Sequence, residues 1–112
     1  MSLLIARPLP LALIEMISHR LQLLGQPLRI RVIDHLERHG EVNVQGLADA
    51  LAATQQNISR ALGLLAQAGV VERRPAGRVV WYRLSDPDAF QLIQTVAVTV
   101  LQQLQLEQRN DR

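Results

Sequence analysis

Residues 43–68 read NVQGLADALAATQQNISRALGLLAQA, and the spacing of apolar positions in this stretch predicts two short helices joined by a tight turn. Asn43 suits the N-cap of the first helix, because its side chain can accept a hydrogen bond from a free backbone amide. Ala52 and Ala53 form the turn, and Thr54 suits the N-cap of a second helix. The positions expected to be buried are Leu47, Ala48, Leu51, Ile58, Leu62 and Leu65. We therefore expect a helix-turn-helix over 43–68.

The segments on either side extend this unit into a larger fold. Residues 70–74 and 79–84 alternate like two strands around a turn at 75–78 that contains Gly, so 70–84 is predicted to be a β-hairpin, or wing. Helices are expected at 11–24, at about 27–39 and at 87–108, each bounded by Pro or Gly. The expected fold is mainly α: a winged helix-turn-helix of order α-α-α-α-β-β-α, forming a single domain over 1–112.

Candidate DNA-binding side chains gather at two places. Polar residues that can donate and accept hydrogen bonds to base edges begin the second helix of the pair, and arginines surround the hairpin turn. Polar residues at a helix start also serve capping, and a charged hairpin is often only a solvated edge. The two features in this order favour double-stranded DNA as the partner, with the recognition helix in the major groove and the wing along the backbone. The predicted contact residues are Thr54, Gln55, Gln56, Asn57, Ser59, Arg60, Arg73, Arg74 and Arg78.

The two terminal helices, 11–24 and 87–108, carry apolar stripes wider than a domain of this size can cover alone. The last helix has no charged side chain between Asp88 and Glu107, which is typical of a helix buried in an interface. We therefore expect a homodimer formed by these helices, although they could instead close the core of one chain. The predicted interface residues are Leu13, Ile14, Ile17, Leu21, Phe90, Ile93, Ala97, Val100 and Leu104.

The composition narrows the possible functions. The 112 residues carry a net charge of +2 with no cysteine, which excludes disulfides, thiolate metal sites and cysteine nucleophiles. No serine–histidine–aspartate arrangement or phosphate-binding glycine loop points to an enzyme. The apolar start at 3–5 is broken by Arg7, Pro8 and Pro10, so no export signal is expected, and glutamines interrupt the uncharged part of the last helix. A cytoplasmic protein without a membrane span is predicted.

Several motifs together resemble the ArsR/SmtB repressors. The resemblance is close from 23 to 84 and extends to the terminal helices by pattern. It implies a dimeric repressor that an inducer, often a metal or metalloid ion, releases from its operator. The motifs are LGQPLRIR at 24–31, LADAL at 47–51, NISR at 57–60, AGVV at 68–71, GR at 77–78 and WYRL at 81–84.

The chain departs from that family at its metal-sensing positions. Asn43 and Gln45 stand where soft-metal sensors carry cysteines. Of the positions that bind zinc on the last helix of other members, Asp86 and Asp88 keep ligand chemistry, whereas the second pair has become Thr99 and Gln102. No metal site and no cofactor are therefore expected, and the inducer is not predicted.

Two further departures bear on DNA binding. The family often places His and Lys where Ala61 and Gly63 stand, so the resemblance implies that two DNA contacts are missing. This favours, as one alternative, a winged-helix protein-interaction module that does not read DNA.

Three histidines bear on the other alternative, a metal-responsive repressor with an atypical site. His35 and His39 have a spacing of four that suits a metal, but no third ligand accompanies them, and a solvent-facing position is expected. His19 is expected at the surface or the dimer interface.

The leading prediction is a repressor that binds a palindromic operator as a homodimer.

Overall fold

The computed structural model describes residues 5–110, so residues 1–4 of the apolar start lie outside the described residues. The chain is mainly helical, with a three-stranded antiparallel sheet, and its winged helix-turn-helix architecture confirms the predicted fold class. The elements in order are α1 (Leu11–Leu24), α2 (Pro27–His39), β1 (Val42–Asn43), α3 (Val44–Leu51), α4 (Gln55–Gln67), β2 (Val71–Ala76), β3 (Val79–Leu84) and α5 (Pro87–Asn110).

Local side-chain contacts set the bounds of α3 and α4. The Asn43 side-chain oxygen accepts a hydrogen bond from the Gly46 amide at 2.7 Å, and the Thr54 hydroxyl accepts one from the Asn57 amide at 3.1 Å. These caps satisfy amides that have no partner inside their own helices. Between them Ala52 ends α3 in the left-handed conformation, with φ 51°. The chain thereby turns sharply from α3 into α4.

The sheet differs in two ways from the prediction. The strand β1 was not expected, because two residues are too short to show an alternating pattern; it pairs with β3 at the register Val42–Tyr82. The predicted four-residue turn at 75–78 is wrong, because Pro75 and Ala76 belong to β2 and only Gly77 and Arg78 form the turn. The strand order β1-β3-β2 leaves β2 at the edge of the sheet, where a proline without an amide proton is tolerated.

The core lies between α2, α3, α4 and the base of the wing. Its largest fully buried side chains are Val32, Ile33, Leu36, Leu47, Ile58, Leu62, Leu65 and Val70. The terminal helices contribute little to it: Leu24 of α1 and Ala89 of α5 are their only fully buried residues within the described part of the chain. In α2, Val32 is buried in the core, whereas Ile30 is only half-buried.

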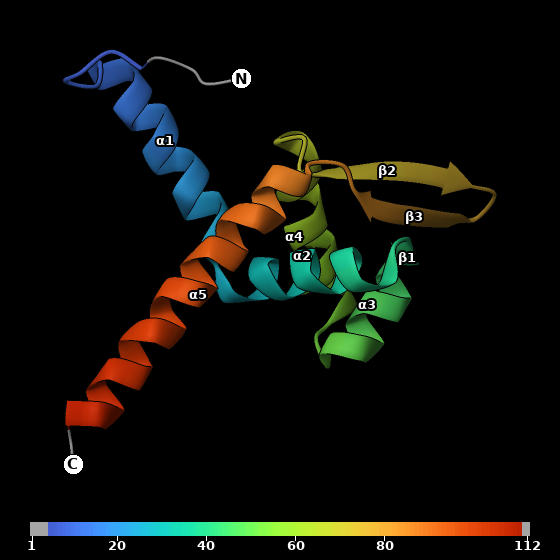
Figure 1. Cartoon of the computed structure of the whole chain (residues 1–112). Helices are drawn as coiled ribbons and strands as arrows, with labels where there is room; N and C mark the ends of the chain where they lie inside the picture. Colours follow the sequence, from blue (N-terminus) through green and yellow to red (C-terminus); the bar gives the residue numbers. More distant parts are fainter. Residues whose placement is uncertain (1–4, 111–112) are drawn as a thin grey trace.

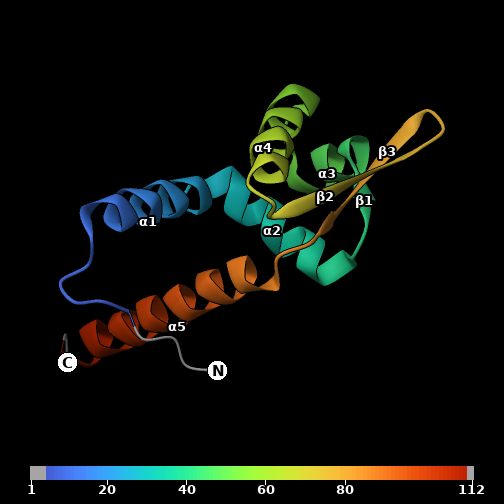
Figure 2. The ribbon, with the colours of Figure 1, turned by 90° about the horizontal axis from the view of Figure 1, so that it is seen from above.

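The terminal helices and the wing extend from opposite sides of this core (Figure 1). Figure 2 shows the same division from above, with α1 and α5 on one side and the β2–β3 hairpin on the other. None of the helices within residues 5–110 combines the length and apolarity needed to cross a bilayer.

Candidate nucleic-acid interface

The helix α4 presents its polar residues on one exposed face. Its buried side consists of Ile58, Ala61, Leu62 and Leu65, which repeat at helical spacing and pack into the core. The predicted reading residues all lie on the exposed remainder of the helix or at its cap: Thr54, Gln55, Gln56, Asn57, Ser59 and Arg60. The fold thus leaves these side chains accessible together at the N-terminal end of α4.

A chain of amide hydrogen bonds orients the first of these side chains. Gln55 Nε2 donates to Gln45 Oε1, and Gln45 Nε2 donates to Asp49 Oδ1 at 2.8 Å. Gln55 therefore keeps its carbonyl oxygen and one amide proton free, while Gln56 and Asn57 have no side-chain hydrogen bond to any residue within 5–110. Sequence reasoning considered Gln45 only as a missing metal ligand, although its spacing of four from Asp49 on an exposed helix face was a signal for such a pair.

The charge of α4 itself favours an anionic partner. The helix contains no acidic residue, and its N-terminus carries the positive end of the helix dipole. Arg60 is exposed and forms no ion pair within the described residues. Backbone amides and an unpaired guanidinium at one helix end suit contacts to phosphate oxygens.

The arginines of the wing fall into two classes. Arg73 and Arg78 are exposed and have no ion-pair partner among residues 5–110. Arg74 instead donates to both carboxylate oxygens of Glu41, at 2.6 and 2.8 Å, and this contact lowers the pKa of Glu41. A guanidinium held by a bidentate pair is less available to phosphate than a free one, so Arg74 differs from the other predicted wing contacts.

The two positions at which the family often carries basic residues differ from each other. Ala61 is only 4% exposed and faces the core, so it does not mark a missing DNA contact and that expectation is wrong. Gly63 lies on the exposed face of α4, and a Cβ built there would meet no atom within 4 Å. Of the two positions, only Gly63 is therefore placed where a basic side chain could reach DNA.

The histidines do not assemble into a metal site with other ligands. No group of three or more potential ligands occurs within residues 5–110. The His35 and His39 rings lie 4.2 Å apart, and burial, helped by the charges of His39 and Arg38, lowers the pKa of His35. His39 is exposed as expected, whereas His35 is half-buried and does not simply face solvent.

The predicted dimer stripe divides into two parts. Phe90 and Ile93 pack partly against the core of their own chain, as the alternative of a closed monomer core required. The predicted interface residues further along α5 do not: Val100 is 47% exposed and Leu104 49% exposed. Ala97 is exposed too. On α1, Leu13 is half-buried, and the remaining predicted interface residues Ile14, Ile17 and Leu21 are exposed.

Comparison with known proteins relates this chain to transcriptional regulators. A MarR-family model matches residues 25–79, which hold the helix-turn-helix and much of the wing but neither terminal helix. The HTH-type transcriptional repressor SmtB of Mycobacterium tuberculosis is 37% identical over 79 residues, which are 70% of this chain and 58% of that protein. The chain thus spans less than two thirds of this relative.

Two further proteins match over a larger share of their length. The biofilm growth-associated repressor of Xylella fastidiosa is 31% identical over 77 residues, which are 69% of this chain and 67% of the repressor. A solved homodimeric winged helix-turn-helix DNA-binding domain from Mycobacterium bovis, described as a possible ArsR-family regulator, superimposes with a TM-score of 0.71 at 28% identity. That match covers 83% of this chain and 85% of the domain.

Proposed function

Because this chain belongs to the ArsR/SmtB family of winged helix-turn-helix transcriptional regulators, we propose that it binds a palindromic operator as a homodimer and represses transcription. The relatives described above are named as transcriptional repressors or regulators rather than enzymes.

The observation that carries this proposal is the exposed, acid-free N-terminal face of α4. Gln56 and Asn57 offer free amide groups that can pair bidentately with adenine in the major groove, and Arg60 can reach guanine or phosphate. Thr54 caps the helix and Gln45 orients Gln55. Ser59 is also exposed on this face.

The wing supplies contacts that do not depend on sequence. Arg73 and Arg78 are assigned to the phosphate backbone, because both are exposed and free of ion pairs within the described residues. Arg74 is assigned a weaker phosphate contact than Arg73 or Arg78, since binding to phosphate would compete with its contact to Glu41.

The proposed dimer uses the exposed stripes of α1 and α5. These apolar side chains lie outside the core of the single chain, and a second copy with the same stripes would cover them by two-fold symmetry. Such a dimer would place two copies of α4 against half-sites about one DNA turn, roughly 34 Å, apart. The protein would act in the cytoplasm, where bacterial operator DNA is found.

The side chains at the candidate metal positions bear on whether a metal ion is the inducer. Neither the positions that bind metals in relatives nor the histidine pair provides a set of ligands, so we propose a regulator that does not respond to a metal ion through those sites. No cofactor is assigned.

Selection from a randomised pool of DNA duplexes, followed by fluorescence anisotropy on the enriched sequence, tests the proposal. We expect an enriched sequence with two-fold symmetry, bound at least about a thousandfold more tightly than its scrambled version at near-physiological salt. Weak and equal binding to every duplex would contradict the proposal and favour a protein-interaction module.

A further inference from the structure

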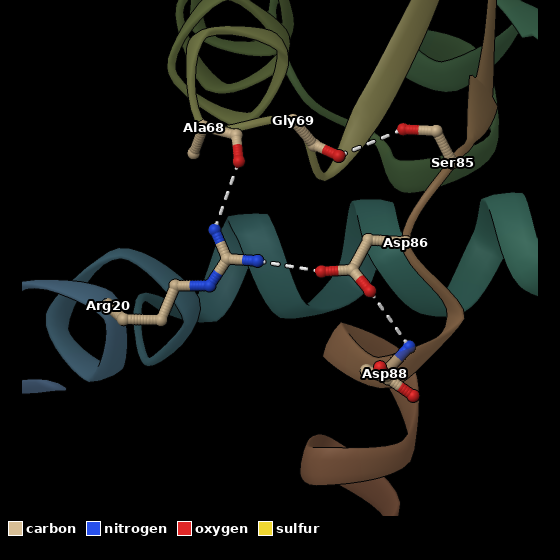
Figure 3. A network of polar contacts seen from close by, with 6 residues as sticks. All are labelled: Arg20, Ala68, Gly69, Ser85, Asp86 and Asp88. Carbon is tan, nitrogen blue, oxygen red and sulfur yellow. Dashed lines mark hydrogen bonds and ion pairs between the residues drawn. The ribbon is translucent and has the colours of Figure 1, made fainter.

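Arg20 of α1 lies where three elements of the fold meet (Figure 3). Its Nη1 donates to the backbone oxygen of Ala68 at 3.1 Å, and its Nη2 donates to Asp86 Oδ2 at 2.7 Å. Ala68 ends α4, and Asp86 immediately precedes α5. One guanidinium thus connects a terminal helix to the end of the recognition helix and to the start of the other terminal helix.

Both contacts lie at helix ends: Arg20 pairs a backbone oxygen at the end of α4 and the carboxylate that caps the start of α5. Carbonyl oxygens in the last turn of a helix have no intrahelical partner, and a basic side chain there is favourable. Asp86 uses its second oxygen, Oδ1, to accept a hydrogen bond from the Asp88 amide at 3.0 Å and so caps α5. The same carboxylate therefore holds the start of α5 and the guanidinium of Arg20.

The connection between β3 and α5 is fastened to the connection between α4 and β2. Ser85 Oγ donates to the Gly69 oxygen at 3.0 Å, and the amides of Ser85 and Asp86 both donate to the Val70 oxygen, at 2.9 and 3.2 Å. Within residues 5–110, Arg20 supplies the hydrogen bonds that join α1 to this junction. Beyond Arg20, α1 contributes a single fully buried residue, Leu24, to the core.

We infer that Arg20 is a positioning residue for DNA binding: it transmits the orientation of the dimerisation helices to the recognition helix without touching DNA. The inference rests on the proposed function. Arg20 contacts the C-terminal end of α4, whereas the reading residues lie at the N-terminal end. A helix of 13 residues is about 20 Å long, so a tilt of about 5° at the clamped end moves the far end by about 1.7 Å. Such a shift exceeds the distance tolerance of a hydrogen bond to a base.

The test compares operator and scrambled duplex for variants of Arg20 and Asp86. We expect Arg20→Ala to bind the operator about tenfold more weakly, equivalent to about 1.4 kcal/mol, with unchanged affinity for scrambled DNA. The salt dependence should stay the same, because no phosphate contact is lost. Arg20→Lys keeps the charge but cannot make both hydrogen bonds from a planar guanidinium, so an intermediate loss of operator affinity is expected. Arg38→Ala, at the exposed end of α2, serves as the matched control and should leave all these values unchanged.

A double-mutant cycle tests whether Arg20 acts on DNA binding through its ion pair with Asp86. Asp86→Asn removes the charge that faces Arg20, while asparagine remains a good helix cap. If the two residues act together, the double variant binds the operator no more weakly than Arg20→Ala alone. Sedimentation measurements on each variant establish that the dimer is intact at the concentrations used.

Three results would overturn the inference. They are an unchanged operator preference in Arg20→Ala, a salt slope lowered by about 1.8 (one phosphate contact per protomer), which would place Arg20 on the DNA, or a loss explained entirely by dissociation of the dimer. Failure of the proposed function looks different, because the unmodified protein itself would then show no preference for any selected sequence.

Discussion

Replacing Arg78 by Ala isolates the contribution of the wing. Arg78 occupies the two-residue turn between β2 and β3, is exposed, and has no ion pair within the described residues, so its removal leaves no partner unpaired. The substitution removes one phosphate contact from each protomer, and the loss of two contacts per dimer lowers the slope of log affinity against log salt by about 1.8. Between about 50 and 200 mM salt, the unmodified dimer should therefore lose about 12-fold more affinity than Arg78→Ala.

Fluorescence anisotropy with a labelled operator and a scrambled duplex measures this slope directly. The reduction should be the same on both duplexes, because a phosphate contact carries no sequence information. Arg74→Ala provides a graded comparison: its guanidinium already binds Glu41, so the change in slope should be smaller than for Arg78→Ala. Arg38→Ala should change nothing. An unchanged slope in Arg78→Ala would refute the reasoning and remove the wing from the interface.

Four other substitutions or titrations test separate parts of the structure. Gln56→Ala should lower discrimination by about 1–3 kcal/mol at one base pair per half-site, whereas Gln67→Ala at the far end of α4 should not; equal losses on operator and random DNA would show that Gln56 reads no base. Gly63→Ala should raise the free energy of unfolding in denaturant by about 1 kcal/mol, because the added Cβ enters open space on a helix, and no gain would contradict this. Val100→Glu should shift sedimentation from dimer to monomer without unfolding the chain, since Val100 lies outside the core; an equally tight dimer would place the interface elsewhere. NMR titration should give His35 a pKa below 6.5, so that the unfolded state binds the proton more tightly and the free energy of unfolding falls as the pH drops through 6.5; a pKa at or above this value would contradict the burial.

Features determined by short-range interactions were predictable from the sequence. The caps at Asn43 and Thr54 act over three residues, and the structure shows both hydrogen bonds. The burial of Ala61 was also predictable, because positions 58, 61, 62 and 65 share one helix face, but the resemblance to relatives that carry a basic residue there led to the wrong expectation.

Features that depend on pairing between distant segments were not predictable. The short strand β1 exists because β3 offers it a partner, and the length of the hairpin turn follows from the register between β2 and β3. The contact of Arg74 with Glu41 joins residues 33 positions apart, and that of Arg20 with Asp86 joins residues 66 apart. Sequence composition indicates which arginines are present, whereas only the folded chain shows which of them are already occupied.

Hydroxyl-radical footprinting of the selected operator reports sequence-specific binding and two-fold symmetry in one measurement. If the protein binds its operator as a homodimer, we expect two equivalent protected segments whose centres lie about 10–10.5 base pairs, or one helical turn, apart, with the same protection on both strands. A single unpaired segment, or uniform weak protection along the whole duplex, would contradict it.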